Sequence, residues 1–245
     1  MFSVALAALL SSPTFLSRAH SHNDYLQARP LDEALDNVFA SVEADLFLVD
    51  GKLLVAHDRR SVTPSKTFES MYLGPIAARM RENKGWVYPG VHKTFWVLVD
   101  QKADGAAVYA EVKRAIADHP EFKSPNIRFV ISGDRPVDSI LGDKGRWAGL
   151  DGRWGDIGKG ISKDVMPWVS EDWTDHFKWN GSGPFSTDEA RSLASMVRAA
   201  HKGGYKLRFW GAPDTPEMWE IQWKAGVDWI NTDHLSALRA WMLKK

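Results

Sequence analysis

The chain has 245 residues, enough for a sizeable core, and α/β barrels commonly use about 250 residues as a single domain. Its 31 basic residues balance 31 acidic residues, so no overall field recruits nucleic acid or an anionic membrane. The absence of cysteine excludes disulfides, thiolate metal sites and a cysteine nucleophile.

An apolar segment opens the chain. Phe2 to Leu10 is rich in small apolar residues and precedes a Ser-Ser-Pro sequence, which is typical of a secretory signal peptide, although a basic start is missing. We expect residues 1–12 to be this leader and residues 13–245 to form one domain. If the leader is real, we expect a secreted or periplasmic protein; without a leader, we expect a cytoplasmic one. No later segment approaches the roughly 18 apolar residues of a transmembrane span.

The first strands carry the acids on which the functional prediction depends. We expect a short strand from Phe15 to His20. The helical spacing of apolar residues predicts a helix from Pro30 to Phe39. A strand from Ser41 to Leu48 follows. Because residues i and i+2 of a strand share a face, Glu43 and Asp45 point to the same side.

A hairpin brings a second histidine to these acids. Asp50-Gly51 is a strong turn signal between the sequences LFLV and KLLVAH. The chain is therefore expected to fold back, so that His57 lies beside Glu43 and Asp45.

Strands and helices alternate along the rest of the chain. A helix is expected from Thr67 to Asn83, with Gly74-Pro75 as the point where it could break. A buried strand is expected from Thr94 to Lys102, with Asp100 and Lys102 on one face. The remaining expected elements are helix 106–117, strand 127–132, a glycine-rich region 142–163 with short strands, strand 165–170, loop 172–184, a helix from Ser186 or Thr187 to His201, strand 206–210, helix 216–225, strand 227–233 and helix 235–243.

This order predicts an α/β protein, specifically a single (β/α)8 TIM barrel. Roughly eight strand signals alternate with helices, which favours a parallel sheet closed on itself. The active site of such a barrel lies at the C-terminal ends of the strands. The chain places the following polar residues there: Glu43, Asp45, Asp100, Lys102, Arg208 and Asp233.

The acids predict a metal site. Like charges inside a sheet that is covered on both faces need a compensating cation. Oxygen ligands favour a divalent Mg²⁺ or Ca²⁺ ion, for which we expect Glu43, Asp45 and Asp100 as ligands. For Asp100, an ion pair with Lys102 is the alternative. His20 and His57 would flank the metal as acid and base.

Several motifs together resemble a known superfamily. The chain has a histidine, then Glu-x-Asp about twenty residues later, then His-Asp about a dozen residues further. This order and spacing resemble the pattern of the glycerophosphodiester phosphodiesterase and sphingomyelinase D group of phosphatidylinositol phospholipase C-like barrels. The sequences AHSHNDY, RPL, SVEAD, LLVAHD and INTDHL resemble more closely the branch named after altered inheritance of mitochondria protein 6. The resemblance runs from about Arg18 to the C-terminus. It implies a phosphoric diester hydrolase, or a lyase that releases a cyclic phosphate, acting on a glycerophosphodiester or phospholipid-like substrate.

The candidate residues suit this chemistry. A metal neutralises the non-bridging oxygens of a diester, and histidines near their ordinary pKa of about 6.5 can exchange acid and base roles. Lys102 is expected to face the substrate phosphate. Arg208 is expected to contact it too, or else to pair with Asp100 or Asp233. His22 is a further candidate for phosphate contact, and Trp210 forms either a pocket wall or a core layer.

Two other functions fit parts of the sequence. His20-x-His22 also resembles the HxH metal motif of amidohydrolases and related phosphoesterases, which bind Zn²⁺ or Mn²⁺, but the other histidines do not fall at the ends of middle strands. A barrel that binds a phospholipid or a glycan phosphate without catalysis is the second alternative. Zinc-dependent amide hydrolysis, in place of Mg²⁺- or Ca²⁺-dependent diesterase activity, would indicate the first alternative. Tight binding of a ligand without turnover of any diester would indicate the second.

Overall fold

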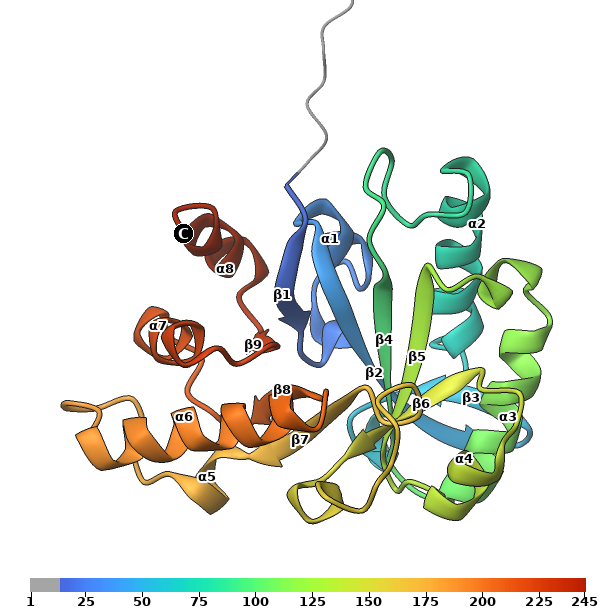
Figure 1. Ribbon diagram of the computed structural model, residues 1–245. Helices are drawn as coiled ribbons and strands as arrows, with labels where there is room; N and C mark the ends of the chain where they lie inside the picture. Colours follow the sequence, from blue (N-terminus) through green and yellow to red (C-terminus); the bar gives the residue numbers. More distant parts are fainter. Residues whose placement is uncertain (1–13) are drawn as a thin grey trace, which may run out of the picture.

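The computed structural model describes residues 14–245 and has an α/β barrel at its centre (Figure 1). The predicted signal peptide, residues 1–12, lies outside the described residues. The strands are β1 Leu16–Ser21, β2 Phe39–Val49, β3 Lys52–Val55, β4 Phe95–Gln101, β5 Ile127–Gly133, β6 Ala148–Gly152, β7 Trp168–Asp172, β8 Lys206–Trp210 and β9 Ile230–Thr232. The helices are α1 Asp32–Asp36, α2 Gly74–Glu82, α3 Gly105–Ala117, α4 Val137–Gly142, α5 Trp173–His176, α6 Thr187–Lys202, α7 Pro216–Ala225 and α8 Leu235–Met242.

Eight parallel strands form a nearly closed barrel, which confirms the predicted (β/α)8 fold. Their order is β8-β7-β6-β5-β4-β2-β1-β9, and β3 pairs with β2 outside this series. A parallel bridge between Arg208 and Trp229 brings β8 to the start of β9. The carboxyl ends of all eight strands therefore meet at one end of the barrel.

Aromatic and aliphatic side chains fill the opposite, N-terminal part of the barrel interior. Trp168 and Trp229 meet edge to face with ring centroids 4.9 Å apart, and Leu98 and Val130 pack with them. The residues between these positions point outward and pack under the helices. Apolar side chains thus fill the interior at the N-terminal, or lower, end of the barrel. The layers at the C-terminal, or upper, end are left for polar side chains.

The predicted hairpin is present and carries His57 to the upper end of the barrel. Asp50 and Gly51 have φ angles of 49° and 73°, the left-handed values that a tight two-residue turn requires. β3 pairs antiparallel with β2, and the Ala56 amide donates to the Asp45 carbonyl. His57 therefore starts its loop directly beside Asp45.

The structure adds α4, and it places α5 inside the expected loop 172–184; the strands expected at 165–170 and 227–233 span 168–172 and 230–232. Two predicted helices also differ from the structure. The helix expected from Pro30 to Phe39 spans only Asp32–Asp36, because Val38 has a left-handed φ of 58° and Phe39 already begins β2. Gly74-Pro75 does not break its helix: a π-helical turn at Glu69–Leu73 runs directly into α2, and Pro75 lies at this junction. Within residues 14–245, none of the helices combines the length and the hydropathy needed to cross a bilayer.

Substituting Gly133 should destabilise the barrel at its upper rim. Gly133 has a φ of +69°, and a Cβ there would lie 2.0 Å from Asp100 Oδ1 and 2.3 Å from the Gln101 carbonyl. We expect Gly133→Ala to lower the free energy of unfolding by more than about 2 kcal/mol, or Tm by about 4 to 8 °C. Gly142→Ala is the control, because nothing lies within 4 Å of its Cβ. Equal melting temperatures for the two variants would contradict this placement of Gly133.

Candidate active site

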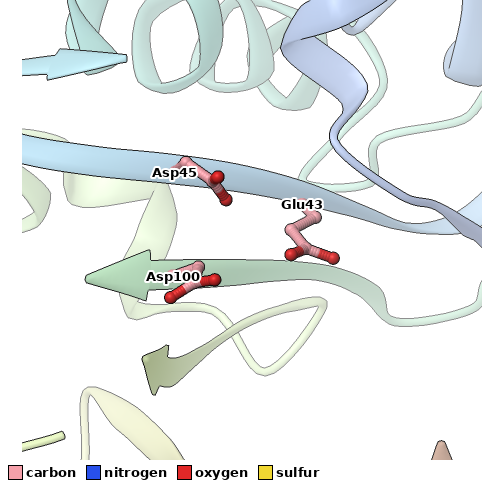
Figure 2. A group of neighbouring side chains, drawn as sticks. All are labelled: Glu43, Asp45 and Asp100. Carbon is pink, nitrogen blue, oxygen red and sulfur yellow. The ribbon is translucent and has the colours of Figure 1, made fainter. Parts of the chain in front are cut away.

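Three carboxylates converge at the C-terminal end of the barrel (Figure 2). Glu43 and Asp45 project from β2, and Asp100 projects from β4 at the register position opposite Asp45. One oxygen from each of the three side chains lies within 4.8 Å of the others. The i, i+2 prediction for β2 and the choice of Asp100 as the third member of the cluster therefore agree with this geometry.

The cluster fits a metal ion because one of its buried oxygens has no partner. Asp45 is 0% exposed, and its Oδ1 makes no hydrogen bond. Its Oδ2 is fully engaged, at 2.6 Å from the Tyr25 hydroxyl and 2.7 Å from Lys102 Nζ. An unsatisfied anionic oxygen in a buried site is costly, and a divalent cation with oxygen ligands would satisfy it. Glu43, Asp45 and Asp100 are the residues that would hold the ion.

Two cations lie against the same acids. Lys102 Nζ is 2.7 Å from Asp45 and 3.0 Å from Asp100, which is the ion pair expected as the alternative for Asp100. Arg208 is buried and pairs with Glu43, rather than with Asp100 or Asp233. Three acids thus share two cations.

Burial and repulsion make the acids unequal. Burial raises the pKa of Asp45 to about 7, and the charges of Glu43 and Asp100 add to the increase. Burial and the charge of Glu43 also raise the pKa of Asp100. Burial would also raise the pKa of Glu43, but the charge of Arg208 and the hydrogen bond from His20 hold it well below its usual value. The cluster therefore carries a permanent anion on one side and two carboxyls that resist ionisation on the other.

His20 supports the cluster from beneath. It is 0% exposed, its Nδ1 lies 2.8 Å from Ser41 Oγ, and its Nε2 lies 3.0 Å from Glu43 Oε2. Burial and the charge of Arg208 lower the pKa of His20 to about 4. In this arrangement both ring nitrogens are occupied, and the side chain does not line the cavity above the acids.

His22 and His57 do line that cavity, which has a volume of about 470 Å³. His22 Nδ1 lies 3.0 Å from Asp233 Oδ1, and His57 Nδ1 lies 3.3 Å from Asp45 Oδ2. Burial would lower the pKa of His22, but the hydrogen bond that His22 donates to Asp233 and the charge of Glu43 outweigh it, and the pKa is raised. Each imidazole is therefore held through Nδ1 by an acid.

The remaining predicted residues lie on the cavity wall. Lys102, Arg208 and Trp210 all line it, and Trp210 is 41% exposed, so it is a wall residue and not part of a core layer. Arg153 and Ser132 complete the side beyond Asp100.

Sequence reasoning missed three contributors. Arg153 lies in the glycine-rich region, where periodicity gives no signal, and it is held by the buried Asp151 at 2.9 Å. Asp233 was expected among the polar residues at the C-terminal ends of the strands, but its pairing with His22 was not. Tyr25 contacts both Asp45 and His57. Its only signal was its place in the sequence AHSHNDY.

The amidohydrolase alternative finds no support in this geometry. Within residues 14–245, the three acids are the group brought together closely enough to hold a metal ion. His20 and His22 hold different partners, Glu43 and Asp233 respectively. They therefore do not form a joint histidine site.

The lowered pKa of His20 predicts a pH-dependent stability. Unfolded His20 takes up a proton near pH 6.5, whereas the folded chain takes it up only near pH 4, so stability is lost as the pH falls between these values. The loss from this group should be roughly 3 kcal/mol. Urea unfolding of wild type and His20→Asn at pH 7.5, 5.5 and 4.5 measures it. The difference between the two proteins should shrink as the pH falls, whereas a constant difference would exclude a neutral buried His20.

Comparison with known proteins agrees with the predicted family. Residues 11–122 match the AIM6-like phosphodiesterase domain. The chain is 24% identical over 260 residues to the altered inheritance of mitochondria protein 6 homolog of Arthroderma benhamiae, covering 91% of this chain and 82% of that protein. It is 28% identical over 278 residues to altered inheritance of mitochondria protein 6 of Eremothecium gossypii, covering 96% and 72%, and 23% identical over 271 residues to that of Saccharomyces cerevisiae, covering 88% and 68%. The comparisons thus confirm the resemblance of this chain to altered inheritance of mitochondria protein 6 that the sequence motifs predicted.

Proposed function

We propose that the protein is a metal-dependent phosphoric diester hydrolase, or cyclising lyase, that acts on a glycerophosphodiester or phospholipid-like substrate. The observation that carries this proposal is the cavity in which two imidazoles, each anchored through Nδ1, stand beside three acids that fit a divalent ion. Such a site offers what diester cleavage needs: neutralisation of the phosphate charge, a base for the attacking hydroxyl and an acid for the leaving oxygen.

We assign the acid–base pair to His22 and His57, in place of the expected pair His20 and His57. A general acid or base must come within hydrogen-bond reach of the substrate, directly or through one water. His22 and His57 line the cavity, whereas His20 is buried under Glu43 with both nitrogens engaged. His20 then acts as a positioning residue for Glu43.

The other residues have distinct tasks in this mechanism. A divalent ion, once bound, supplies Lewis-acid stabilisation of charge on the non-bridging oxygens. Lys102 and Arg208 lie on the cavity wall, where they can donate charge-assisted hydrogen bonds to the same phosphate. Trp210 offers an apolar face for the organic part of the substrate.

Removing either cavity histidine should abolish most of the activity. We expect His22→Ala and His57→Ala each to reduce kcat by on the order of 10² or more, because proton transfer by a positioned group contributes 10² to 10⁴. The substrates are bis(p-nitrophenyl) phosphate, glycerophosphodiesters and lysophospholipids, each assayed with Mg²⁺ and with Ca²⁺. His92→Ala is the matched control, since His92 packs on Trp86 before β4, at the other end of the barrel.

The outcome also distinguishes the two assignments and the alternative function. Near wild-type rates in His22→Ala with loss in His20→Ala would restore the pair expected from sequence. Tight binding of a phospholipid without turnover, unchanged by His57→Ala, would favour the non-catalytic barrel.

Binding of the ion can be measured without a substrate. Mg²⁺ or Ca²⁺ at 100 times its Kd should stabilise the wild-type protein by about 2.7 kcal/mol in a thermal or chemical unfolding experiment. Asp100→Asn should remove most of this stabilisation because it replaces one of the three anionic ligands. Asp138→Asn, an exposed acid on α4, should leave it unchanged. An equal metal response in all three proteins would mean that the ion binds elsewhere.

A further inference from the structure

We propose that Tyr25 is the positioning residue of His57, holding the ring so that Nε2 faces the substrate. This inference deepens the proposed function and rests on it. Tyr25 is 4% exposed, and its hydroxyl lies 2.6 Å from Asp45 Oδ2, 3.1 Å from His57 Nδ1 and 2.9 Å from Asn23 Oδ1. One buried phenol thus joins a candidate metal ligand to a cavity histidine.

Counting protons fixes the direction of these hydrogen bonds. A phenol has a single proton to donate, and burial and the charge of Asp45 raise the pKa of Tyr25 above its ordinary value near 10, so it keeps that proton at neutral pH. A divalent ion held by the cluster would keep Asp45 ionised, and this carboxylate would then be both the nearest and the strongest acceptor for the proton of Tyr25. His57 Nδ1 then faces two oxygens that can only accept from it, at 3.1 Å in Tyr25 and 3.3 Å in Asp45. Nδ1 must therefore carry a hydrogen.

The tautomer has a consequence for catalysis. A neutral imidazole with a proton on Nδ1 has its lone pair on Nε2. Because His57 lines the cavity and is held through Nδ1, Nε2 is the nitrogen left to exchange a proton with a substrate. Without the Tyr25 hydroxyl, Nδ1 keeps only the longer contact to Asp45. The ring would then rotate more freely and populate both tautomers.

The chain holds Tyr25 firmly in this place. Asn23 adopts a left-handed conformation, with φ 44° and ψ 45°, which turns the chain back over the barrel end. The neighbouring Asp24 is 0% exposed and accepts hydrogen bonds from the Leu31 amide at 2.6 Å and the Tyr72 hydroxyl at 2.9 Å. The phenol is thus fixed from behind, as a positioning residue requires.

Tyr25→Phe tests the proposal because it removes one oxygen and keeps the packed ring. We expect kcat for a diester to fall about tenfold or more at saturating metal, while KM changes less than about threefold. The ¹⁵N NMR signals of His57, assigned by their loss in His57→Ala, should change from an Nδ1-protonated ring to a mixture of tautomers. Tyr88→Phe is the matched control: it loses a buried hydroxyl bonded to the Phe39 carbonyl at 2.6 Å, away from the cavity, and should alter neither measurement.

A double-mutant cycle separates positioning of His57 from other effects. If Tyr25 acts through His57, Tyr25→Phe should cost less than about twofold in the His57→Ala background. An equal loss in both backgrounds, a loss that excess metal reverses, or an unchanged His57 tautomer would overturn the proposal. If the wild-type protein cleaves no diester, the proposed function fails, but the NMR experiment still tests the role of Tyr25.

Discussion

The mutual repulsion of three carboxylates inside one barrel end is the constraint on which the rest of the site depends. Glu43, Asp45 and Asp100 are brought together out of water, where like charges are expensive. Lys102 and Arg208 offset two of the three charges. Burial, together with the remaining imbalance of charge, raises the pKa of Asp45, and one of the two buried oxygens of Asp45 has no partner. A divalent ion would correct both, and this is the physical basis for expecting a metal here.

The barrel makes such a cluster possible by separating its interior into layers. Indole rings and aliphatic side chains fill the lower part, where Trp168 and Trp229 meet. The hydrophobic contribution to stability therefore comes from below and from under the helices, not from the upper end. Because the register places Asp45 opposite Asp100, the strands themselves set the spacing of the acids. The apolar packing at the lower end and under the helices thus stabilises the strands that carry the three acids.

The extent to which the sequence predicts this site follows from the geometry of strands. The alternation of side chains in β2 and β4 predicts the three acids, and Asp50-Gly51 predicts the return of the chain to His57. That rule fails at the end of β1, where Ser21 is the last strand residue. His20 and His22 would share a face in a longer strand, but His22 lies beyond β1, on the rim. Tyr25 is reached through a left-handed residue, which no periodicity predicts.

Residues of the same type therefore differ in role according to their depth in the barrel. One layer down, His20 has both nitrogens occupied and a pKa of about 4, so it serves as a neutral support for Glu43. At the rim, His22 and His57 keep one nitrogen toward the cavity. Asp45 connects the two levels because its Oδ1 is free for an ion while its Oδ2 faces Tyr25 and His57. A single carboxylate would thus couple the position of a bound ion to the orientation of the His57 ring.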